Sequence, residues 1–90
     1  MKVEVLYVDG RRVEMEISKK NAIRQINKLI GCDTGDTVNL RDGRVMCVDD
    51  TGMIDGKPIN KQATKLYHSI YSTPFSIHGD AVIAVDEDFA

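Results

Sequence analysis

Apolar and polar residues alternate along the N-terminal part of the chain, and this period of two predicts a β-hairpin. The strands are expected over residues 2–8 and 12–17. A three-residue loop at residues 8–10 pairs Val5 with Val13 and places the apolar residues of both strands on one face, which a two-residue loop does not. We therefore expect the longer loop, with its glycine in the left-handed conformation of a bulge.

The spacing of apolar residues then lengthens to a helical period and predicts a helix over residues 19–30. Its apolar positions form one stripe, made of Ala22, Ile23, Ile26, Leu29 and Ile30. Ser18 is a residue type that favours an N-terminal cap, and Gly31 is placed to end the helix in a left-handed conformation. The sequence therefore predicts both ends of this helix.

A polar loop at residues 33–36 precedes a second predicted hairpin, with strands near residues 37–41 and 44–49. Asp42-Gly43 is typical of a two-residue turn between two strands. This turn would set apolar residues opposite one another, namely Leu40 with Val45 and Val38 with Cys47. The apolar pairing favours this register.

The last third of the chain predicts one helix and one strand. Asn60 is expected to cap a helix near residues 61–71, and Pro74 must end it. A strand over residues 81–85 is apolar throughout. Such a strand is typical of an interior position in a sheet that is covered on each face, or on one face by a second subunit.

The predicted elements follow one another in the order β-β-α-β-β-α-β, and 90 residues are enough for one domain. We expect a single domain over residues 1–90 of the α+β class, with a single mixed β-sheet and two helices packed on one face. Residues 86–90 are expected to be a frayed acidic tail. Because so short a chain has a modest core, we also expect a homo-oligomer.

Negative side chains are absent from the predicted helices, and this separation of charge predicts a surface with an uneven charge distribution. The helices and the lead-in to the second one carry only positive formal charges, on Lys19, Lys20, Arg24, Lys28, Lys57, Lys61 and Lys65. All 14 acidic residues lie on strands, in loops or in the tail, so the net charge of -2 hides the separation. Two helices on one side of a sheet would present a basic face to an anionic partner.

The residues that could carry catalysis or bind a metal do not form a known constellation. His68 and His78 have no nucleophile motif around them, and Cys32 and Cys47 lack the spacing of metal ligands. The aspartates of residues 49–55 do not match a calcium loop, because apolar residues stand where oxygen ligands are needed. We therefore expect no enzyme activity, no bound metal and no cofactor.

Membrane insertion is also not expected. The longest apolar run, residues 81–85, is far shorter than a membrane-spanning helix requires. The N-terminus has no apolar region of a signal peptide. The sequence therefore predicts a cytoplasmic protein.

The start of the second predicted helix is the best candidate for a ligand site. Lys57, Asn60 and Lys61 would surround a helix N-terminus, where free N–H groups and the helix dipole attract phosphate or carboxylate groups. Arg24 and Lys28 of the first helix are lesser candidates. The alternative is a solvated lysine face without a ligand. Nucleic acid is a less favoured partner, because no recognition motif or stacking aromatic pair accompanies the cations.

Residues 48–66 resemble a small family of phage and mobile-element proteins of unknown function. The shared pattern is a polar turn after a strand, a glycine-x-proline-x-asparagine step from Gly56 to Asn60, and then a helix. The Gly79-x-apolar start of the last strand and the earlier order of elements are also similar. The resemblance implies a phage or mobile-element accessory protein and supplies no catalytic residues.

The resemblance and the helix cations together favour one function and leave one alternative. The favoured hypothesis is a non-enzymatic protein that counters host defence by binding and sequestering an anionic nucleotide signal. The alternative is an inhibitor that docks on an acidic host or defence protein through the basic helical face. In either case the expected location is the host cytoplasm.

Overall fold

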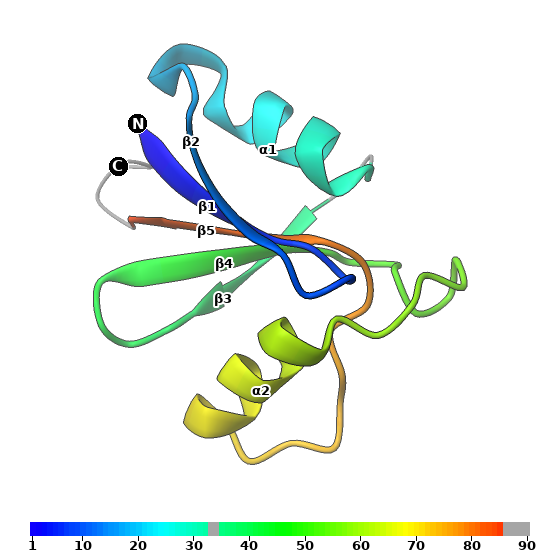
Figure 1. Cartoon of the computed structure of the whole chain (residues 1–90). Coiled ribbons are helices and arrows are strands. Elements are labelled where there is room, and N and C mark those ends of the chain that lie inside the picture. The colour runs from blue at the N-terminus through cyan, green and yellow to red at the C-terminus, as the bar shows by residue number, and fades with distance from the viewer. Residues whose placement is uncertain (33–34, 86–90) are drawn as a thin grey trace.

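Five antiparallel strands form one sheet in the order β2-β1-β5-β4-β3 (Figure 1). The computed structural model describes residues 1–32 and 35–85. The strands are β1 (Lys2–Leu6), β2 (Arg12–Glu16), β3 (Gly35–Asn39), β4 (Arg44–Asp49) and β5 (Ala81–Val85). The helices are α1 (Ala22–Ile30), which follows a 3-10 turn η1 (Lys19–Asn21), and α2 (Lys61–Ile70). The α+β class and the element order are confirmed, and the predicted tail at 86–90 lies outside the described residues.

The prediction of a mixed sheet is wrong, because β5 runs antiparallel to both of its neighbours, β1 and β4. The reason is the segment between α2 and β5. It carries the chain back to the end of the sheet where α2 begins, as the antiparallel bridge between Ile59 and His78 shows. A strand that starts there must run against β4, which ends at the same place.

The prediction that both helices pack on one face is also wrong, since α1 and α2 lie on opposite faces (Figure 1). The side chains of β5 explain this arrangement. Ala81 and Ile83 belong to the buried cluster under α2, whereas Val82 and Ala84 belong to the cluster under α1. Because the central strand is apolar on both sides, each face needs its own cover, and one helix supplies each. The predicted interior position of this strand is confirmed.

The first hairpin has the predicted register. Val5 lies opposite Val13, and the amide of Tyr7 donates to the carbonyl of Arg11 at 3.0 Å across a three-residue loop. Gly10 has φ +95°, a conformation that glycine adopts without a steric cost. The apolar faces of the two strands therefore meet on the side that α1 covers.

The second hairpin differs from its predicted register by one residue. Val45 lies opposite Asn39 instead of Leu40, and Val38 lies opposite Met46 instead of Cys47. The turn has three residues, with positive φ at Arg41 and at Gly43. The predicted register would have paired more apolar residues. Residues 45–48 are buried on both faces of β4, however, so their burial does not depend on an apolar residue opposite them, and apolar pairing was a poor guide to this register.

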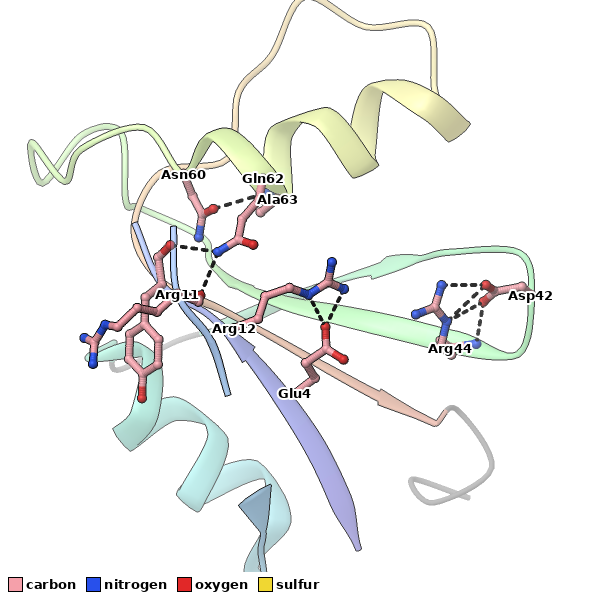
Figure 2. A network of polar contacts seen from close by, with 9 residues as sticks. Glu4, Arg11, Arg12, Asp42, Arg44, Asn60, Gln62 and Ala63 are labelled. Carbon is pink, nitrogen blue, oxygen red and sulfur yellow. Dashed lines mark hydrogen bonds and ion pairs between the residues drawn. The ribbon is translucent and has the colours of Figure 1, made fainter. Parts of the chain in front are cut away.

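The two helices begin in different ways. Ser18 makes no side-chain cap hydrogen bond, so the predicted cap is wrong, and the chain passes through η1 before α1 begins at Ala22. The predicted C-terminus of α1 is confirmed, because Gly31 has φ +76° and its amide donates to the carbonyl of Asn27. Asn60 does cap α2, since its Oδ1 accepts from the amide of Ala63 at 3.1 Å (Figure 2).

The side chain of Asn60 also connects distant parts of the chain. It is fully buried, and its Nδ2 donates to the carbonyl of Leu6 at 2.8 Å and to that of Gly79 at 3.0 Å. These carbonyls belong to the end of β1 and to the residues just before β5. One amide group therefore satisfies the start of α2 and fixes two neighbouring strands relative to it.

We predict that Asn60→Ala lowers the free energy of unfolding by about 2–4 kcal/mol, because it removes a cap and the buried hydrogen bonds that Asn60 donates to two carbonyls. Urea unfolding measures this change. Asn21→Ala is the matched control, since Asn21 precedes α1 without a side-chain cap bond and is exposed. A loss of similar size in both variants would contradict the role assigned to Asn60.

Candidate functional site

Lys57, the first predicted ligand residue, is engaged in contacts within the fold. Its Nζ lies 2.6 Å from Oδ2 of Asp49, whose side chain is only 2% exposed. The same Nζ donates to the carbonyls of Gly31 at 3.0 Å and Ile30 at 3.3 Å. A cation at the C-terminus of a helix is favourable for the helix dipole. Lys57 therefore joins the end of α1 to the end of β4.

Asp49 gains a stabilised negative charge from this arrangement. Burial alone would raise the pKa of its carboxyl group, but hydrogen bonds from the Lys57 ammonium and from the backbone amide of Thr51 outweigh that effect, so the pKa is lowered. The Thr51 hydroxyl lies 3.3 Å from the same carboxylate oxygen that its amide contacts. The charge pair is thus satisfied within the chain, and no ligand is required to balance it.

The remaining predicted ligand residues are not brought together. Asn60 is buried with its amide group fully engaged. Lys61 is exposed at the start of α2, whereas Arg24 and Lys28 are exposed on α1, on the other face of the sheet. Lys28 lines an open groove of about 520 Å³ at the end of α1, but the carboxylates of Asp49 and Asp55 line it too. A single anion site built from the five residues is therefore not assembled.

Several cations of the hairpins form ion pairs with carboxylates, whereas most cations of the helices form none among the described residues. Arg12 pairs with Glu4 and Arg44 pairs with Asp42 (Figure 2), and Arg11 pairs with Asp9. In contrast, five helix cations form no ion pair within the described parts of the chain, namely Lys20, Arg24, Lys28, Lys61 and Lys65. Lys2 and Arg41 of the hairpins also form no ion pair within these residues, so most, but not all, of the unpaired positive charge of the described chain lies on the helices.

The exposed side of α1 combines these cations with an apolar residue. Arg24 and Lys28 are one helical turn apart and exposed, and Lys20 lies in η1 just before them. Ile23, which the sequence pattern assigned to the core stripe, is 56% exposed between Lys20 and Arg24. Its position at the margin of the apolar stripe is the sequence feature that could have shown this. We call Lys20, Ile23, Arg24 and Lys28 the α1 surface.

Each cysteine and histidine side chain is either buried or hydrogen-bonded to another group of the chain. Burial raises the pKa of the Cys47 thiol to about 11, which disfavours its reactive thiolate form. Nδ1 of His78 lies 2.9 Å from the carbonyl of Lys57, and Nε2 of His68 lies 2.6 Å from that of Phe75. Within residues 1–32 and 35–85, no group of three metal-ligating side chains comes together, and no helix has the length and hydrophobicity to span a membrane.

The chain belongs to the DUF3846 family, a domain of unknown function whose model matches residues 1–90. No match was found among the curated proteins or among the solved structures. The expectation of a family of unknown function is thereby confirmed, and the family covers the whole sequence.

We predict that Lys57→Met lowers the free energy of unfolding by about 2–4 kcal/mol, because it leaves the buried Asp49 carboxylate without its cation. Lys61→Met is the control, because it removes the same charge only four residues further along the chain, and the exposed Lys61 side chain forms no ion pair within the described residues. Thermal and urea unfolding of both variants test this. Equal stability of the two variants would show that the ion pair contributes nothing.

A second prediction concerns pH. The lowered pKa means that ionised Asp49 contributes stability above its unfolded value of 3.8, and that this contribution is lost as the pH falls through the folded value. The difference in unfolding free energy between wild type and Asp49→Asn should therefore shrink between about pH 5 and about pH 2. Urea titrations at several pH values measure it, and parallel curves for the two proteins would contradict the assignment.

Proposed function

We propose that this domain is a non-enzymatic binding protein that docks through the α1 surface on an acidic region of a partner protein. The observation that carries the proposal is the combination of an exposed isoleucine with three cations that have no ion-pair partner in the described chain. Such cations carry no internal electrostatic stabilisation that a partner would have to disrupt. Their attraction to opposite charge would steer association and orient the complex.

The exposed apolar side chain favours a protein partner over a phosphate polymer. Ile23, at the margin of the exposed side of α1, can be buried in an apolar depression while Lys20, Arg24 and Lys28 beside it meet carboxylates. A desolvated apolar centre with a charged rim is the usual anatomy of a protein interface. A phosphate backbone would use the three charges and leave the isoleucine without a contact.

The proposal includes a biological setting that rests on the sequence resemblance. A phage or mobile-element accessory protein in the host cytoplasm would meet host and defence proteins as its targets. Docking on such a protein would inhibit it by covering its surface. A homo-oligomer would present several copies of the α1 surface and strengthen binding through multivalency.

Sequestration of an anionic nucleotide draws less support from the geometry. It requires Lys57 and Asn60 to contact phosphate, whereas both side chains satisfy buried groups of the fold. The cations left for a nucleotide are Lys61 on one face and Arg24 with Lys28 on the other. No single small ligand could use all three.

We predict that the double substitution of Arg24 and Lys28 by Glu abolishes capture of a specific acidic partner from host lysate by immobilised protein. The matched control replaces Lys61 and Lys65 by Glu, which makes the same change in net charge on the opposite face of the sheet. All four side chains are exposed, so the unfolding free energy of both variants should stay within about 0.5 kcal/mol of the wild-type value.

The controls separate the two functions. Loss of the partner in the α1 variant alone supports docking, and loss only in the α2 variant, or equally in both, contradicts it. Calorimetric titration of the wild-type protein with cyclic and linear nucleotides tests the alternative function, nucleotide sequestration. Saturable heat that disappears in the α2 variant would favour sequestration over docking.

A further inference from the structure

A second surface, on the other side of the sheet, has a different character. A groove of about 270 Å³ opens between the ends of β3 and β4, α2 and the segment before β5. Its floor contains the apolar side chains of Val38, Val48 and Ile77 from the cluster under α2. We call this depression the α2-side groove. None of the predicted ligand residues lines it.

Two large apolar side chains form the walls of the groove and remain mostly exposed. Met53 is 62% exposed and Phe75 is 63% exposed, although both line the depression. Ile54, next to Met53, is 83% exposed. Scattered apolar side chains are common on protein surfaces, but apolar walls around an apolar floor mark a place where a partner can bury area.

Acidic side chains line the same groove. Asp36 on β3 and Asp50 after β4 are exposed, and neither forms an ion pair within the described residues. Asp49 also lines it, but Lys57 neutralises that carboxylate. The free charge at the groove is therefore negative, which is opposite to that of the α1 surface.

We infer that the α2-side groove binds a basic segment of a partner protein that inserts one large apolar side chain between Met53 and Phe75. The volume of the groove suits a single anchoring side chain, and Asp36 and Asp50 would pair with lysines or arginines on either side of that anchor. Tyr67 of α2 supplies a further aromatic contact to the anchor. This surface is independent of the α1 surface and would recognise a partner of opposite charge.

The test uses a synthetic hexapeptide with a central Phe-Leu pair between two pairs of lysines, blocked at both ends. NMR titration of the isotope-labelled wild-type protein should give saturable shifts around residues 36, 53, 67 and 75, with a Kd on the order of 10⁻⁴ M. Phe75→Ser and Asp50→Lys should each weaken binding by about tenfold or more. Both replaced side chains are exposed, and circular dichroism checks that the variants fold.

The control protein is Glu14→Lys, which makes the same charge reversal as Asp50→Lys on the strand at the opposite edge of the sheet and should change the Kd by less than about twofold. The control peptide has two serines in place of Phe-Leu. Equal binding of that peptide, or equal weakening by Glu14→Lys, would overturn the inference. Sedimentation at several concentrations measures the oligomeric state. A dimer that Phe75→Ser dissociates would overturn the inference and assign the groove to a second copy of this chain.

Discussion

Three segments that are far apart in the sequence meet at the buried side chain of Asn60. The carboxamide oxygen accepts a hydrogen bond from the amide of Ala63 in the first turn of α2. The carboxamide nitrogen donates to the carbonyl of Leu6 at the end of β1 and to that of Gly79 just before β5. All three hydrogen bonds are buried, and removing the partner of a buried polar group costs about 1–3 kcal/mol. Together with the ladders that pair β5 with β1 and β4, this polar group fixes where the chain enters the centre of the sheet.

Lys57, three residues before Asn60, connects the same segment to α1 and β4. It reaches the last carbonyls of α1 and the carboxylate at the end of β4, so both faces of the sheet are linked through residues 57–60. Close backbone packing accompanies these contacts, since a Cβ on Gly52 would lie 2.6 Å from the carbonyl oxygen of His78. A glycine, a lysine and an asparagine at these positions are thus explained by the fold. Lys57 and Asn60 had suggested an anion site in the sequence, because binding an anion and stabilising the fold both call for hydrogen-bond donors near a helix N-terminus.

The parts of the fold that could be predicted from the sequence are those with one dominant constraint. Val5 and Val13 fixed the first hairpin, because only one register puts its apolar residues together. The second hairpin lacked that constraint, since residues 45–48 are buried on both faces of β4. The placement of the helices depended on contacts between distant segments. Periodicity assigns a face to each residue within an element, but it does not say which side of the sheet a helix will cover.

The apolar character of β5 on both faces also determines how the surface can be used. Because one helix is needed on each side, the helix cations that look like one set along the sequence become two sets separated by the sheet. Ion pairs within the hairpins then neutralise Arg11, Arg12 and Arg44, whereas the α1 surface keeps cations that are unpaired within the described chain beside an exposed apolar side chain. The acidic groove lies beside α2, on the other face. A partner that covers α1 would therefore leave the groove open.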